Sequence, residues 1–195
     1  MAITMKLSDD KFEKIKITKV STNKVCTNVY YDSFSIGKVR FQNANYNEKT
    51  KIDCYMDFEE LALLATDVAN GRIIKKLEAG EKISFMTGSK SSKNYNGQPE
   101  SRVLSFGISV KNDGPEVKKT IFFNMSRGKG KLSETGAIMP DGAPDLKIGV
   151  PMSVDKFRSM LIYTHDWVTA YLAGNVNQLV GMADADRKAN ANSNQ

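Results

Sequence analysis

Apolar and polar residues alternate most clearly just before the first strong helix pattern of the chain. Over residues 51–56 every second residue is apolar, which predicts a strand with one buried face. Asp57 then offers an N-cap, and Glu60 three residues later completes a capping-box pattern. An apolar stripe at helical spacing follows and stops at Gly71, so the pattern predicts a helix between Asp57 and Gly71.

Weaker alternation predicts three strands before this point, over residues 14–20, 25–31 and 34–42. In the third of these, Phe34 and Ile36 have the opposite phase to Val39 and Phe41. Gly37 lies between the two pairs and therefore marks an expected bulge. The first part of the chain thus has the predicted order β-β-β-β-α.

The same order recurs in the second half. Alternation predicts strands that include residues 83–87, 104–110, 117–124 and 146–152. Ser153 is the expected N-cap of a second helix, which the pattern ends at Gly174. Residues 87–99 indicate a long hairpin loop, and residues 125–145, rich in glycine, indicate a strand interrupted by a loop. Residues 183–195 lack apolar periodicity, which predicts a disordered tail after a single domain over residues 1–182.

These patterns predict an α+β protein in which two β-β-β-β-α units pack a basic antiparallel sheet on helices. The length of 195 residues suits one domain. One histidine and two cysteines are too few for a four-ligand zinc site, and we expect two reduced core thiols, no metal and no cofactor. The chain has no apolar run long enough for a signal peptide or membrane span, so we expect a soluble, cytoplasmic protein without a membrane partner.

Charge is distributed unevenly along the chain. Residues 1–56 carry a net charge of +4 and residues 82–133 carry +7, whereas residues 57–81 carry −3 and residues 134–195 carry −2. The predicted strands fall mostly in the basic segments and the predicted helices in the acidic ones. A basic sheet backed by acidic helices favours a nucleic-acid-binding protein.

The outward faces of the predicted strands interleave lysines with aromatic residues. Lysines contact phosphates, and aromatic rings stack on bases that a duplex would hide, so the combination favours single-stranded nucleic acid. Either Tyr30 or Tyr31 faces out, and the outward pair near residue 120 is either Lys118 with Phe122 or Lys119 with Phe123. The candidates for phosphate contacts are Lys38, Arg40, Lys51, Lys118, Arg127, Lys129 and Lys131, and those for stacking are Tyr30, Tyr55, Tyr95 and Phe122.

The segment SRGKGKL over residues 126–132 alternates three cations with two glycines. Glycines let backbone amides approach phosphates closely, and in an extended segment the three cations share one side. The spacing differs from that of a Walker loop. The segment therefore predicts a basic loop that contacts phosphates, with a basic hairpin tip that binds no ligand as the alternative.

The order of elements and this basic segment resemble the Whirly family, which shares its fold with small transcriptional coactivators that bind single-stranded DNA. Residues 127–132, RGKGKL, are similar to the Whirly signature K-G-K-A-A-L. Gly130 and Lys131 replace two alanines of that signature, and the motif lies here in the second unit rather than the first. The resemblance implies binding of single-stranded DNA along sheet edges and assembly into homo-oligomers.

We therefore predict a non-enzymatic single-stranded DNA-binding protein with little sequence specificity, acting in replication, recombination or transfer of DNA. Lysine outnumbers arginine 22 to 6, which favours an AT-rich genome such as that of a phage or mobile element. RNA is the alternative nucleic acid. The alternative fold is an OB-fold with a C-terminal extension, because three strands, a helix and two further strands also fit its order.

Two further function classes remain as alternatives. A metal-dependent nuclease needs clustered carboxylates, and Asp53 with Asp57, or Asp141 with Asp145, would have to supply them. His165 has no evident partner for general-base work, so we predict no catalytic residue. An oligomeric adaptor is the other class, with an interface at Trp167, Tyr171 and Leu172 unless these residues pack on the sheet.

Overall fold

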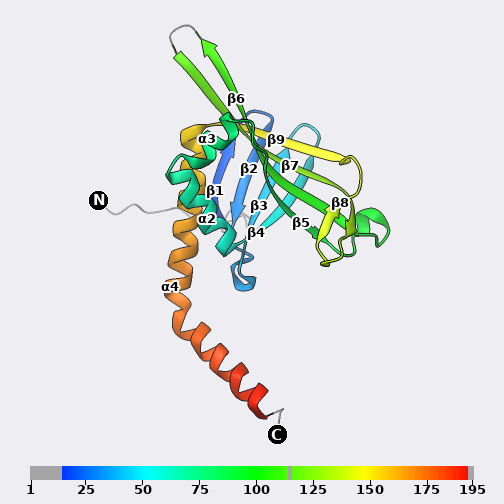
Figure 1. Cartoon of the computed structure of the whole chain (residues 1–195), viewed down its shortest axis with the longest axis vertical. Helices are drawn as coiled ribbons and strands as arrows, with labels where there is room; N and C mark the ends of the chain where they lie inside the picture. Colours follow the sequence, from blue (N-terminus) through cyan, green and yellow to red (C-terminus); the bar gives the residue numbers. More distant parts are fainter. Residues whose placement is uncertain (1–14, 114–115, 193–195) are drawn as a thin grey trace, which may run out of the picture.

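The computed structural model describes residues 15–113 and 116–192, in which antiparallel strands and helices follow one another along the chain (Figure 1). The α+β class predicted from the sequence is confirmed. The strands form two antiparallel sheets: four strands of the first half make one, and the strands of the second half make the other. The helices α2, α3 and α4 lie together on one side of the molecule in Figure 1.

The first sheet has the order β1-β2-β3-β4. Its strands are β1 (Lys16–Ser21), β2 (Val25–Tyr30), β3 (Lys38–Asn45) and β4 (Thr50–Asp57). The strand predicted over residues 34–42 begins only at Lys38, because Phe34–Ile36 form a short 3-10 turn. Gly37 ends this turn with a φ of 70°, a conformation that favours glycine, so the bulge expected at Gly37 is wrong.

Helix α2 (Phe58–Ala69) begins and ends where the sequence predicts. The carboxylate of Glu60 accepts a hydrogen bond from the backbone N–H of Asp57, which confirms the capping pattern. Gly71 follows with a φ of 69° and leads into α3 (Arg72–Glu78), which the sequence analysis missed. Helix α3 is short, and three of its seven residues are buried.

The second sheet is built around a long central strand. Strands β5 (Ile83–Ser89), β6 (Glu100–Asp113) and β7 (Glu116–Leu132) pair in that order, and β9 (Leu146–Ser153) pairs with the other side of β7. The short β8 (Ile138–Pro140) pairs with the last three residues of β7. Residues 126–132 therefore belong to a strand of 17 residues, and the loop predicted for this segment is wrong.

Helix α4 (Val154–Asn192) begins at the predicted N-cap, where Ser153 Oγ accepts a hydrogen bond from the backbone N–H of Lys156. The helix continues through Gly174, so the end predicted there is wrong. Its backbone stays helical over residues 183–192, which differs from the disordered tail predicted over residues 183–195. Alanine, arginine and lysine favour a helix through their intrinsic propensity, whereas an analysis of periodicity detects only an apolar face. In Figure 1 this second half of α4 extends away from the sheets.

The inner faces of the two sheets pack on each other to form the core. Phe41 of the first sheet meets Phe123 of the second at a ring separation of 5.7 Å, and Phe157 of α4 contacts Phe106 and Phe123. Asn43 is fully buried, and its Nδ2 donates hydrogen bonds to the backbone carbonyls of Phe123 (2.8 Å) and Ile148 (2.9 Å). A polar side chain thus connects the first sheet to β7 and β9.

Both cysteines are free and buried, as predicted. Burial raises the pKa of Cys54 to about 12, so its thiol stays protonated at neutral pH.

Two further properties concern only the residues the structure describes. No helix among them is long and apolar enough to cross a membrane. They also contain no group of three or more His, Cys, Asp or Glu side chains placed to hold a metal ion.

Candidate nucleic-acid interface

Three of the predicted site residues form a row across the outer face of the first sheet. Tyr30, Arg40 and Tyr55 are cross-strand neighbours on β2, β3 and β4. The guanidinium of Arg40 lies 4.0 Å from the centre of the Tyr30 ring. It also pairs with Asp32 at 2.7 Å and with Asp53 at 3.1 Å. Hydrogen bonds to these carboxylates use three of the five N–H donors of the guanidinium.

Burial by itself would lower the pKa of Arg40, but the hydrogen bonds and charges of Asp32 and Asp53 outweigh it and raise the pKa. Arg40 is only 9% exposed, and Tyr30 is 4% exposed with its hydroxyl bonded to Gln42. Neither side chain is open to a strand of nucleic acid in this arrangement. The acidic partners on the same face were not anticipated from the sequence.

The other candidate contact residues of the first sheet differ in how exposed they are and in whether an acidic residue pairs with them. Lys38 pairs with Asp57 at 2.6 Å, which places it at the start of α2 rather than on an open surface. Tyr55 is half-buried, and burial, followed by the charge of Asp53, raises its pKa. Lys51 is exposed near the other end of β4. The outer face of the first sheet is thus a paired polar network and not a basic surface.

The outer face of the second sheet is different in character. Phe123 is fully buried and Phe122 is partly exposed, so Lys118 and Phe122 face outward and the choice left open by the sequence is decided. Helices α3 and α4 both contact the inner face. Glu78 of α3 pairs with Lys119, and Phe157 of α4 packs on Phe106 and Phe123. The outward residues define what we call the open face: Ser84, Met86, Val103, Ser105, Gly107, Ser109, Lys111, Lys118, Thr120, Phe122, Asn124, Ser126, Lys147, Gly149 and Pro151.

The open face combines one aromatic ring with small polar residues and lysines. Phe122 lies between Gly107 on β6 and Pro151 on β9, so no large side chain stands directly beside its ring across the strands. Lys111 and Lys118 lie toward the hairpin end, and Lys147 lies toward the other end. None of the fifteen residues of the open face is acidic. Its only charged residues are three lysines.

A hollow of about 380 Å³ lies on the open face beside Pro144. Asn124 forms part of its wall together with Ser105, Ser126 and Lys147. A Cβ atom on Gly149 would approach Asn124 Oδ1 to 2.5 Å, so the glycine lets the amide lie against the strand. Hydroxyl, amide and ammonium groups thus converge on one hollow and can donate hydrogen bonds to an anionic or polar ligand.

The basic segment predicted as a loop lies at the far end of β7. A Cβ atom on Gly128 would approach Pro144 Cα to 2.9 Å, and one on Gly130 would approach Ser101 N to 2.9 Å. Close packing of protein backbone therefore explains both glycines, and no phosphate is needed to account for them. Lys129 is exposed, and Lys131 lies 3.9 Å from Asp141.

Arg127 and Tyr95 also lie at this end of the second sheet. Arg127 is directly opposite Arg102 across the strands, and its Nε is buried without a hydrogen-bond partner. The hydroxyl of Tyr95 donates to Asp145 at 2.8 Å, and its pKa is raised by burial and then by that carboxylate. Tyr95 is thus held by protein contacts rather than presented as a free ring.

Glu100 neutralises Arg102, one of these two arginines. It is fully buried and accepts hydrogen bonds from Ser92, Asn94 and Arg102 at 2.6–2.7 Å. Burial alone would raise the pKa of Glu100, but these bonds outweigh it and lower the pKa. The cluster is a buried ion pair that fixes the 90–99 loop to β6.

The structure thus separates the predicted site residues into three groups. Tyr30, Arg40 and Tyr55 lie on the outer face of the first sheet, Lys118 and Phe122 lie on the open face, and the basic segment with Tyr95 lies at the end of β7. Sequence reasoning missed Lys147 and Asn124 because their strand partners were unknown. Two of the residues considered for an adaptor interface pack within the chain. Trp167 stacks on Tyr31 at a ring separation of 5.7 Å, and Tyr171 contacts Phe34.

Comparisons of this chain with models of known protein families, with curated proteins and with solved structures found no match.

Proposed function

We propose that this chain binds single-stranded DNA with little sequence specificity, and that it does so without catalysing a reaction. The observation that carries the proposal is the open face, where Phe122 is flanked by a glycine and a proline, and all charged residues are lysines. Lysines at both ends can contact phosphates on either side of the base that stacks on the ring. Tyr30 and Arg40, by contrast, act in the proposal as structural residues.

Single strands suit this face better than a duplex does. Stacking on Phe122 requires an unpaired base, and stacking is tolerant of sequence because every base has a π-face. The face carries no arginine, the residue that most often reads guanine through paired hydrogen bonds. RNA shares the phosphates and the base faces, so it remains the alternative ligand.

The order of elements supports the finer fold proposal, a Whirly-like arrangement of two β-β-β-β-α units. Strands β1–β4 precede α2, and strands β5, β6, β7 and β9 precede α4, with the three-residue β8 between β7 and β9. Among the described strands, no pairing joins the two halves, whereas an OB-fold closes its strands into one barrel. Homo-oligomers, and a role in replication, recombination or transfer of DNA of a phage or mobile element, remain part of the proposal.

Fluorescence anisotropy with a labelled strand of about 30 nucleotides tests the proposal through Phe122. Stacking contributes about 1–3 kcal/mol per base, so Phe122→Ala should weaken binding by about 5- to 150-fold. Phe122→Tyr keeps the ring and should bind like the native chain. Tyr46 lies outside the open face and is 44% exposed. Tyr46→Ala is therefore the matched control, and we expect it to leave binding unchanged.

The outcomes separate the parts of the proposal. If the native chain binds the strand and Phe122→Ala binds it equally well, the binding surface is not the open face. If the native chain fails to bind at low salt, single-stranded DNA is the wrong ligand.

A further inference from the structure

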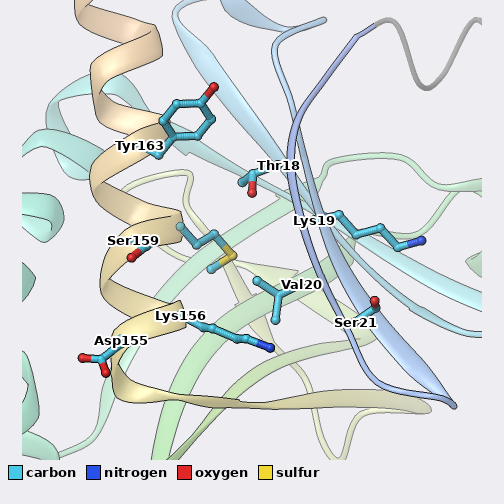
Figure 2. Close-up of a pocket in the computed structure, with 9 residues that line it drawn as sticks. Thr18, Lys19, Val20, Ser21, Asp155, Lys156, Ser159 and Tyr163 are labelled. Carbon is cyan, nitrogen blue, oxygen red and sulfur yellow. The ribbon is translucent and has the colours of Figure 1, made fainter. Parts of the chain in front are cut away.

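A groove of about 460 Å³ lies between the edge strand β1 and the first turns of α4 (Figure 2). Strand β1 contributes Thr18, Val20 and Ser21 to it, and the helix contributes Lys156, Met160 and Tyr163. The three helix residues are four and three positions apart, so they lie on one helix face. The proposed function has not used this groove.

The groove carries a lysine side chain and an accessible aromatic ring. In Figure 2 the side chain of Lys156 points across the groove toward β1, whereas that of Asp155 points away. Lys156 is exposed, and the ion pairs found among the described residues involve other lysines and arginines. Tyr163 is 46% exposed. A cation and an aromatic ring thus line the same groove, two helical turns apart on α4.

A second hollow, of about 340 Å³, connects the groove to the open face. It shares Val20, Ser21 and Lys156 with the groove. It also reaches Lys118, Thr120 and Pro151, which belong to the open face. Lys119 lines this hollow too, but it pairs with Glu78 at 2.5 Å and is not counted as a contact. This hollow and the groove therefore lead from Pro151, the cross-strand neighbour of Phe122, to Tyr163.

We propose that a bound single strand leaves the open face past Ser153 and continues into the groove between β1 and α4. Lys156 contacts a phosphate there, and Tyr163 stacks on a base. This inference rests on the proposed function, and it extends the binding site to a helix that sequence reasoning did not include. It predicts that the groove contributes only when the strand is long enough to reach it.

The test compares strands of about 6 and about 20 nucleotides. The short strand is near the lower end of typical site sizes, and the long strand exceeds them. Lys156→Gln should weaken binding of the long strand several-fold and lower its salt slope by about 0.7, the value for one phosphate contact on a single strand. Tyr163→Ala should weaken binding of the long strand without changing its salt slope. Binding of the short strand should be unchanged in both variants.

Lys75 is exposed on α3, and Lys75→Gln is the matched control for loss of one positive charge. If Lys156→Gln binds the long strand like the native chain, or loses no more affinity than Lys75→Gln, the groove proposal is overturned. In either case binding by the open face can still stand, because Phe122→Ala reports on it separately. If the native chain binds neither length, the proposed function fails and the groove proposal fails with it.

Discussion

Asn43 offers a sharp test of how the two sheets are held together. The perturbation is Asn43→Leu, which keeps a side chain of similar size and removes its polar atoms. Asn43 donates to two backbone carbonyls of the second sheet, and its Oδ1 accepts a hydrogen bond from Thr27 Oγ1 at 2.7 Å. Each buried hydrogen bond contributes about 1 kcal/mol, and unpaired partners add to the cost. We expect a loss of about 3 kcal/mol in the free energy of unfolding.

Urea unfolding followed by circular dichroism measures this loss. Thr27→Val removes only the third hydrogen bond and should cost about 1 kcal/mol. The double variant should lose less than the sum of the two single variants, because both remove the same bond. A loss below about 1 kcal/mol in Asn43→Leu would show that this side chain does not fasten the sheets, and the reasoning would be refuted.

Three further predictions concern single residues. Gly174→Ala should raise the free energy of unfolding by up to about 1 kcal/mol, because α4 runs through this position and no atom crowds a Cβ there; a loss in urea unfolding would contradict the continuous helix. Arg40→Gln should cost about 1–3 kcal/mol in the same assay, yet leave the salt slope of DNA binding unchanged; a lower slope would make Arg40 a phosphate contact. Because the folded-state pKa of Glu100 is lowered, its stabilisation is present above its ordinary pKa of about 4.3 and is lost as the pH falls through the lowered value. Glu100→Gln should therefore flatten the acid side of a stability-against-pH curve, and an unchanged curve would contradict the assignment.

Local patterns were sufficient where neighbouring residues decide the structure. The capping residues Asp57 and Glu60 and the alternation before them placed β4 and α2 correctly. The phase of β7 could not be decided, because Phe122 and Phe123 are both apolar and only contact with Phe41 shows which one is buried.

Long-range contacts explain the parts that the sequence did not predict. The glycines at 128 and 130 resemble a phosphate-binding loop in sequence, but their reason is the approach of Pro144 and β6, which are distant in the chain. Arg40 is likewise expected to face a ligand until Asp32 and Asp53 are seen beside it. A count of charges by segment cannot show which of them neutralise one another.

The central claim, that the chain binds single strands in preference to duplexes, is tested most directly by one titration. Fluorescence anisotropy would follow the native chain with a labelled strand of about 30 nucleotides and with the matching duplex, at several salt concentrations. We predict tight binding of the single strand that weakens steeply as salt rises, and much weaker binding of the duplex. Equal binding of both, or no binding at low salt, would contradict the claim.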